Sequence, residues 1–227
     1  MKKSISYEKQ TYNSPNPIAR FAHRSRFKAS IELAARLLPL DGLLVDFGAG
    51  DGKFLHEVGR QITTVRRLAI EPYMDITLPG IERVKSFEEI DANTVDLITL
   101  LEVAEHLTDY ELGKFLSDAK HALKDKGLLL ITVPIMYGLA LPVKELSRMM
   151  LHRRLSDTSI MEMTRGTFGF EIARAENRKT SHKGFDFREL QKEIDKHFIP
   201  VDSFYLPMKK GAWWVNSQAV FISEKRS

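Results

Sequence analysis

Cysteine is absent from the 227 residues of this chain, and no internal repeat or low-complexity tract interrupts the sequence. Without cysteine the chain can form no disulfide, no thiolate metal site and no cysteine nucleophile. This absence fits a reducing compartment, and we expect the cytoplasm. The length and an apolar content of 43% suffice for one large α/β domain with insertions.

Strong charge of one sign and long unbroken apolar runs are missing as well. The net charge is only +4, because 34 basic residues are mixed with 30 acidic ones, so an anionic partner is permitted but not demanded. The N-terminal lysines have no apolar run behind them, which argues against a secretory signal. The uncharged run 127–143 is broken by Pro134, Gly138 and Pro142, so we expect no integral membrane segment.

The most informative stretch is 44–54, LVDFGAGDGKF. An apolar run predicts a buried strand over 43–47, and a helix is predicted from about 52 to 61. Between them lie three glycines with single spacers, which suit positive φ angles or close approach of a ligand to the backbone. The helix N-terminus behind this turn offers free N–H groups. The spacing differs from the dinucleotide fingerprint G-x-G-x-x-G, whose third glycine position here holds Lys53.

This stretch resembles the first motif of class I S-adenosylmethionine-dependent methyltransferases, and in particular of methyltransferase type 11 and ubiquinone-type O-methyltransferases. Asp46, the three glycines and Phe54 all fit the motif hydrophobic-Asp-x-Gly-x-Gly-x-Gly-x-Phe. The resemblance implies a doubly wound, Rossmann-like α/β sheet of seven strands, mostly parallel with an antiparallel last strand. It also implies S-adenosyl-L-methionine as the cofactor.

The rest of the chain alternates between strand and helix patterns, which favours a parallel sheet with its ligand at the carboxyl ends of the strands. We expect a tail and covering helix over 1–40 and a methyltransferase domain over 41–227, with a substrate-lid insertion at 134–182. The predicted helices are 18–38, 109–123 and 186–198; the later strands are 65–70, 81–85, 96–101, 128–134, 201–206 and 215–222.

Residues at the strand ends are the expected cofactor contacts. Glu71 ends the second strand, about 20 residues beyond the glycines, where an acidic residue binds ribose hydroxyls in this type of fold. In the family an acidic residue after the third strand often binds the adenine amino group, but here that position holds Ser86 or Phe87. Phe87 either packs on the adenine ring or belongs to the core. The full set implied is Asp46, Phe47, Gly48, Ala49, Gly50, Gly52, Phe54, Glu71, Pro72, Ser86, Phe87, Leu101 and Glu102.

The N-terminal helix carries a basic face that includes Arg20, Arg24 and Arg26. One interpretation is a solvated surface. The other is that one arginine binds the cofactor carboxylate or an anionic substrate, because in similar enzymes an N-terminal helix lies over the cofactor.

A second group of residues follows the fourth strand. Glu102, Glu105 and His106 would share one face of a helical turn, and His182 precedes the last helix. The pattern is similar to that of ubiquinone-type O-methyltransferases and of small-RNA 3′-end 2′-O-methyltransferases, in which two glutamates and two histidines bind a divalent metal. Three hypotheses follow: His106 or His182 is a general base, assisted by Glu102; Glu102, Glu105, His106 and His182 bind Mg or Zn; or the group is structural.

The sequence predicts methyl transfer to a hydroxyl oxygen, because the Asn/Asp-Pro-Pro-Tyr type of motif of N-methyltransferases is missing after the fourth strand. The expected acceptor is a small or lipid-linked molecule; the alternatives are a metal-assisted RNA 2′-O-methyltransferase and a non-catalytic cofactor-binding partner protein. The lid is apolar and then basic, which predicts either a helix packed on the domain or a peripheral membrane contact. Its apolar residues are Leu139, Leu141, Leu146, Met149 and Met150, and its basic ones are Lys144, Arg148, Arg153 and Arg154.

Overall fold

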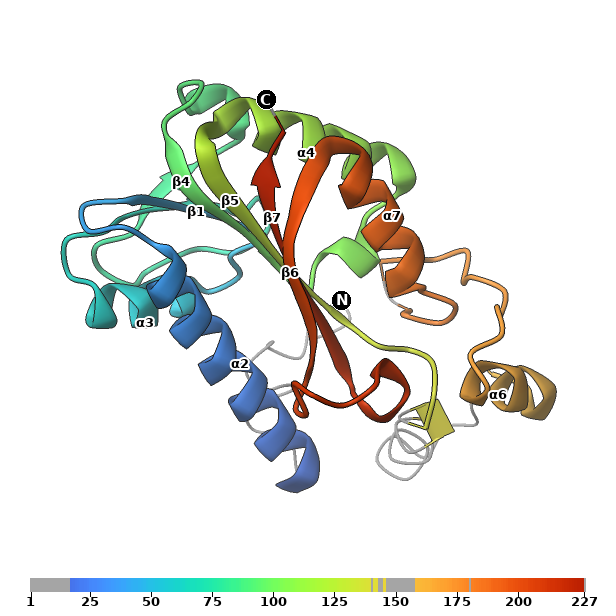
Figure 1. Ribbon diagram of the computed structural model, residues 1–227. Coiled ribbons are helices and arrows are strands. Elements are labelled where there is room, and N and C mark those ends of the chain that lie inside the picture. Colours follow the sequence, from blue (N-terminus) through green and yellow to red (C-terminus); the bar gives the residue numbers. More distant parts are fainter. Residues whose placement is uncertain (1–16, 140, 143–144, 146–157, 180, 227) are drawn as a thin grey trace, which may run out of the picture.

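A seven-stranded sheet with helices on both faces forms the body of the protein (Figure 1). The computed structural model describes residues 17–139, 141–142, 145, 158–179 and 181–226. The strand order is β3-β2-β1-β4-β5-β7-β6. The strands are β1 (Leu43–Phe47), β2 (Arg66–Ile70), β3 (Glu82–Val84), β4 (Val95–Leu101), β5 (Leu123–Pro134), β6 (Phe198–Leu206) and β7 (Gln218–Lys225).

Strands β1 to β5 pair in parallel, whereas β7 lies between β5 and β6 and is antiparallel to both. The predicted fold, a mostly parallel doubly wound sheet with an antiparallel last strand, is therefore confirmed. The helices are α2 (Pro17–Leu37), α3 (Lys53–Gln61), α4 (Asp109–Ala122), α6 (Ile160–Thr167) and α7 (Phe187–His197), with the 3-10 turns η1 (Phe87–Glu89), η2 (Ala104–His106) and η3 (Trp213–Val215).

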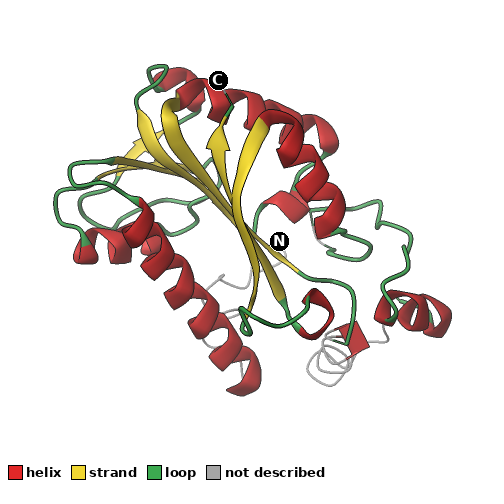
Figure 2. Ribbon diagram, in the orientation of Figure 1, coloured by secondary structure: helices red, strands yellow, loops and turns green. Residues whose placement is uncertain are grey.

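Successive residues of the central strands face opposite sides of the sheet, and each side has its own apolar core. In β1, Leu44 packs with α2 and α3, whereas its neighbour Val45 packs with α4 and α7. In β5, Leu130 packs on the side of α2 and α3, whereas Leu129 packs on the side of α4 and α7. Figure 2 shows the resulting three layers, with α2 and α3 on one side of the sheet and α4 and α7 on the other.

The carboxyl ends of β1, β2, β4, β5 and β6 meet at one edge of the sheet, because these strands run in the same direction. The glycine turn, Glu71 and Glu102 follow three of these ends. Of the predicted lid, 134–182, the structure describes 134–139, 141–142, 145, 158–179 and 181–182. These residues include α6 and most of a segment that we call the strap, 174–179 and 181–183. The predicted lid residues Lys144, Leu146, Arg148, Met149, Met150, Arg153 and Arg154 lie outside the described residues. Among the described helices, none combines the length and the apolar character needed to cross a bilayer.

Candidate active site

A cavity of about 700 Å³ opens at the carboxyl edge of the sheet. Its size falls within the range of small-molecule sites, roughly 300–1,000 Å³. Of the residues predicted to contact the cofactor, all except Gly52 line it, and His106 joins them from η2. Glu105 and His182 lie outside the lining. The structure thus brings together residues from β1, β2, β4 and the turn after β3 that are far apart in the sequence.

The three glycines of the turn have different physical roles. All three have positive φ angles. A Cβ on Gly48 would lie 2.6 Å from Val103, and one on Gly52 would lie 2.8 Å from Ile76, so these two glycines permit close packing. A Cβ on Gly50 would meet nothing nearer than Met74 Sδ at 4.0 Å. Gly50 therefore leaves open space on the side of the cavity, where a ligand can approach the bare backbone.

Glu71 is held rigidly at the tip of β2 by backbone donors. Its Oε2 accepts a hydrogen bond from the N–H of Gly50 at 2.9 Å, and its Oε1 accepts from Tyr73 and Met74 at 2.7 and 3.2 Å. An ionised carboxylate has about four acceptor directions. Three are occupied, so about one remains for a donor in the cavity, which is enough for one ribose hydroxyl.

Asp46, the residue before the last of β1, is a buried carboxylate next to Thr99 of β4. The two residues pair directly in the parallel register, and the Thr99 hydroxyl donates to Asp46 Oδ1 at 2.6 Å. Burial raises the pKa of Asp46 to about 7; the hydrogen bond from Thr99 opposes this shift and the nearby Glu71 adds to it. The cavity therefore has a carboxyl group whose ionisation near neutral pH responds to any positive charge bound beside it.

The turn after β3 places an aromatic ring rather than a carboxylate at the predicted adenine position. Phe87 is buried, stacks on Phe47 with ring centroids 5.9 Å apart, and contacts Phe115 at 6.0 Å. Its ring belongs to the core and also lines the cavity. Ser86 caps η1, with its hydroxyl accepting from the N–H of Glu88 at 3.3 Å.

Glu102 does not share a helical face with Glu105 and His106, contrary to the expectation from their spacing. Only Ala104–His106 form a 3-10 turn, and Glu102 itself has a positive φ of 56°. Its side chain turns toward the end of the sheet instead. Oε1 accepts from Thr132 at 3.2 Å and from Gln218 at 2.8 Å, and Oε2 lies 3.5 Å from Arg26 Nη1 of helix α2.

Glu105, His106 and His182 form a compact group, of which Glu102 is not a member. One ligand atom from each of the three lies within 4.8 Å of the others. The Nε2 atoms of His106 and His182 are 3.2 Å apart, and His106 Nδ1 lies 3.1 Å from the backbone oxygen of Arg178. Glu105 is only 1% exposed, and neither of its carboxylate oxygens has a hydrogen-bond partner among the described residues.

The lid strap that carries His182 is fixed to the turn after β4 by arginines. Arg174 donates to the backbone oxygen of Glu105 at 2.8 Å. Arg178 binds both carboxylate oxygens of Asp109, at 2.6 and 3.3 Å, and this contact lowers the pKa of Asp109. Because the same Arg178 holds His106 through its backbone oxygen, the strap positions both histidines.

Several cavity residues were missed by the sequence analysis. Arg26 was one of the candidate arginines, and it does line the cavity. Thr132 and Gln218 were not recognised; the only signal was a polar residue within or at the start of an otherwise apolar strand. Glu88 lies in an acidic turn that offered no reason to choose it. Tyr73, Tyr110 and Lys179 are further examples of lining residues that the sequence analysis did not select.

A family model described as a methyltransferase domain matches residues 19–156. The chain belongs to this family of methyltransferases. No curated protein matches the chain.

Solved structures show the same fold at low sequence identity. The PH0226 protein from Pyrococcus horikoshii has a TM-score of 0.64 and 13% identity, with 97% of each chain covered. A TehB-like S-adenosylmethionine-dependent methyltransferase from Corynebacterium glutamicum has a TM-score of 0.56 and 16% identity, covering 93% of this chain and all of that one. The 1,6-didemethyltoxoflavin-N1-methyltransferase from Burkholderia thailandensis, with its acceptor and S-adenosylhomocysteine bound, has a TM-score of 0.59 and 18% identity, covering 96% and 85%. The fold is that of class I S-adenosylmethionine-dependent methyltransferases.

Proposed function

We propose that this chain transfers the methyl group of S-adenosylmethionine to a hydroxyl oxygen of a small or lipid-like acceptor. The observation that carries the proposal is that two groups of residues line the same cavity. The first group is the glycine turn with Glu71, and the second is Glu102 with His106. A volume of about 700 Å³ suits a cofactor together with a small acceptor. The Burkholderia thailandensis enzyme, which was solved with its small-molecule acceptor, supports an acceptor of this size.

The residues present fit the cofactor. Gly50 leaves room for a ligand against the backbone, Glu71 retains an acceptor direction for a ribose hydroxyl, and Asp46 offers a buried carboxylate to a cation. When bound, S-adenosylmethionine supplies a methyl group on a positively charged sulfur. The chain must hold the acceptor oxygen in line with this group, and such positioning is worth up to about 7–11 kcal/mol.

His106 is the residue that we assign to the acceptor proton. Because a backbone carbonyl only accepts hydrogen bonds, the contact with Arg178 requires the hydrogen to be on His106 Nδ1, which leaves the lone pair on Nε2. That lone pair faces His182 Nε2 at 3.2 Å, so His182 donates its hydrogen to His106, and an acceptor hydroxyl must displace this contact before His106 can take its proton. His182 lies outside the cavity lining and positions His106. Glu102 is held by Thr132 and Gln218 and orients the hydroxyl.

A divalent cation at Glu105, His106 and His182 is a second proposal for the same site. Two imidazole nitrogens lie 3.2 Å apart and converge with a buried carboxylate whose oxygens have no partner among the described residues. The bond from His106 Nδ1 to a backbone carbonyl is typical of histidines that bind metals. Two histidines and one carboxylate suit zinc better than magnesium, which prefers oxygen ligands. Such a cation would lower the pKa of an acceptor hydroxyl.

Labelled methyl transfer tests the main proposal. Purified protein is incubated with methyl-labelled S-adenosylmethionine and with separated small-molecule, lipid and nucleic-acid fractions. We expect the label in the small-molecule or lipid fraction, in a linkage that resists base hydrolysis because it is an ether. Label in nucleic acid, at nitrogen or in a base-labile ester would contradict the proposal. His106→Ala should lower turnover and leave the affinity for S-adenosylhomocysteine nearly unchanged.

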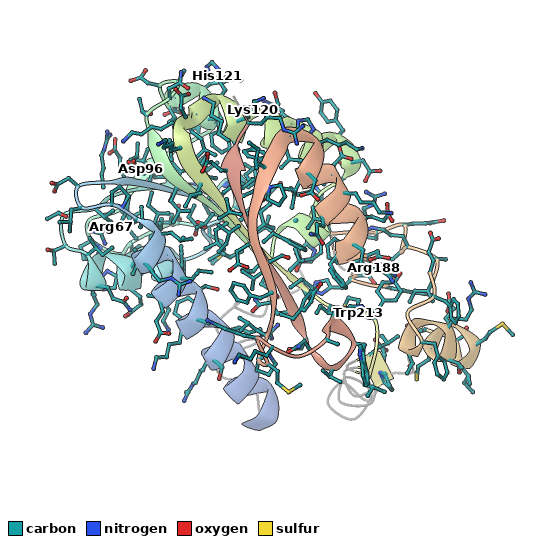
Figure 3. The ribbon with its side chains drawn as sticks, in the orientation of Figure 1. Arg67, Asp96, Lys120, His121, Arg188 and Trp213 are labelled. Atoms are coloured by element: carbon teal, nitrogen blue, oxygen red, sulfur yellow. The ribbon has the colours of Figure 1, made fainter. Side chains whose placement is uncertain are left out.

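Zinc titration tests the cation proposal without measuring activity. Competition against a chromophoric chelator should give one site per chain, and His182→Ala should weaken binding by at least about tenfold. His121→Ala is the matched control, because His121 lies in the last turn of α4 and its backbone oxygen binds Asn93 before the start of β4, whereas the candidate site follows the end of β4; Figure 3 labels His121. No bound zinc, or equal affinity in the two variants, would leave His106 as a base without a metal.

A further inference from the structure

The lid bears a concentration of exposed apolar side chains. We define the lid face by six of them, each between 47% and 85% exposed: Leu139, Ile160, Met161, Phe168, Phe170 and Trp214. They come from three segments, namely the chain after β5, helix α6 with the residues after it, and the turn η3 before β7. Monomeric proteins seldom expose so many large apolar groups together, and such patches usually mark an interaction site.

Backbone hydrogen bonds join the three segments into one surface. The N–H of Gly138 donates to Gly166 at 2.9 Å, and the N–H of Leu139 donates to Trp214 at 2.8 Å. Arg188 of α7 binds the backbone oxygen of Gly169 at 3.1 Å, and its guanidinium lies 5.4 Å from the ring centre of Trp213; Figure 3 shows Arg188 and Trp213 close together. The lid face is therefore fixed to the domain rather than carried on an independent arm.

Helix α6 has an inner and an outer side. On the inner side Gly166 is buried, and a Cβ there would lie 2.6 Å from Leu141 and 3.6 Å from Ile172. Ile160 and Met161 are on the outer side, 85% and 75% exposed. The apolar groups of the lid face are thus additional to those that pack α6 on the domain.

Charges around the lid face are mainly positive. Among the described residues of the segments that carry the lid face, the exposed charged ones are Arg165, Lys209, Lys210 and the acid Glu171. Glu162 is engaged on α6, where it completes the capping box with Ser159 and pairs with Lys183 at 2.9 Å. Apolar and aromatic side chains with surrounding cations complement a bilayer that contains anionic lipids.

We propose that the lid face docks on an anionic lipid bilayer. Phe168, Phe170 and Trp214 would enter the boundary between headgroups and acyl chains, while Lys209 and Lys210 face the anionic headgroups. The segments that carry the face leave the sheet at the ends of β5 and β6, which belong to the same edge as the cavity. This interaction is independent of the proposed methyl acceptor and needs no activity assay.

Vesicle sedimentation tests this proposal with the full chain. Vesicles of phosphatidylcholine with about one third phosphatidylglycerol should pellet the protein, and phosphatidylcholine alone should pellet at least about fivefold less. Raising the salt concentration should weaken the binding, because it screens the cations. The double variant Phe168→Ser/Phe170→Ser should lose at least about fivefold in bound fraction. Lys209→Glu/Lys210→Glu should lose binding to the anionic vesicles only.

The matched control is Leu40→Ser/Ile199→Ser, which removes two exposed apolar side chains outside the lid face and should bind like the unchanged protein. Thermal melting followed by circular dichroism shows whether each variant is folded. Equal pelleting with both kinds of vesicle, or pelleting that the phenylalanine variant does not change, would overturn the proposal. So would a dimer in light scattering that the phenylalanine variant dissociates, since the lid face would then be an interface between two copies.

Discussion

At the scale of single residues, Asp46 is both a buried residue of the sheet and part of the lining of the proposed cofactor cavity. A carboxyl group buried under the cavity is costly to ionise, and its pKa is raised to about 7. A bound sulfonium cofactor with its ammonium group would favour the ionised form. Thr99 opposes the effect of burial through its hydrogen bond.

The stability of the protein should therefore depend on pH through Asp46. The pKa is about 7 in the folded protein and about 3.8 when unperturbed, so between pH 4 and pH 7 the native state binds more protons than the unfolded state. The free energy of unfolding contributed by this group then falls as the pH rises through that window, by a few kcal/mol at most, at about 1.4 kcal/mol per pKa unit. Urea unfolding at pH 5 and pH 7.5 measures this change.

Asp46→Asn is the comparison, because the amide oxygen can still accept from Thr99 but does not ionise. We expect the variant to show a smaller loss of stability between the two pH values than the unchanged protein. The same pH dependence in both proteins would show that Asp46 does not have a raised pKa.

Residue roles were predictable from the sequence only where a local motif carried them. Gly48, Gly50 and Glu71 follow strand ends, so their meeting at one edge follows from the parallel order of the strands. The approach of His106 to His182 joins positions 76 residues apart and depends on the path of the lid strap. Glu102 points away from Glu105 and His106 because its φ angle is positive. A positive φ is uncommon for a residue other than glycine, so the sequence offered no reason to expect it.

At the scale of elements, the turn between β1 and α3 is the part that the proposal depends on most. Gly50→Val adds a side chain on the cavity side at a φ of +56°. We expect the affinity for S-adenosylhomocysteine to fall by at least about tenfold, or about 1.4 kcal/mol. Isothermal titration measures the affinity, and urea unfolding measures the cost of backbone strain, about 1–2 kcal/mol.

Gly80→Val is the matched control for this variant. Gly80 also has a positive φ, but it lies outside the cavity, and an added Cβ would meet only the flexible end of Arg67. It should lose comparable stability and keep its affinity for S-adenosylhomocysteine. If both variants keep that affinity, the bare backbone of Gly50 is not a ligand contact.

The elements of the sheet were predicted well because each strand is an apolar run between turn signals. Strand β1 has the predicted bounds, and α4 ends one residue earlier than expected. The closing hairpin was predicted less accurately. Its second strand begins at Gln218 rather than Val215, since Trp213–Val215 form a 3-10 turn that binds the chain after β5. Aromatic residues favour strands in isolation, but here a contact between distant segments determines the conformation.

At the scale of the whole molecule, the strand order explains why two separate sequence motifs form one cavity. Strands β1 and β4 are neighbours although β2 and β3 lie between them in the sequence, so the glycine turn and the residues after β4 face each other. Helix α2, which packs on the same side of the sheet as α3, contributes Arg26 to the cavity lining. The sequence could predict this order through the resemblance to a known fold, but it could not predict how the lid packs.

The central claim is that this cavity binds S-adenosylmethionine, and titration calorimetry with S-adenosylhomocysteine tests it most directly. The measurement is made at two temperatures, so that a small enthalpy at one of them is not mistaken for absence of binding. The account predicts one site per chain with a dissociation constant in the micromolar range, roughly −8 kcal/mol, and a large loss of affinity in Gly50→Val. No heat of binding at either temperature would contradict it.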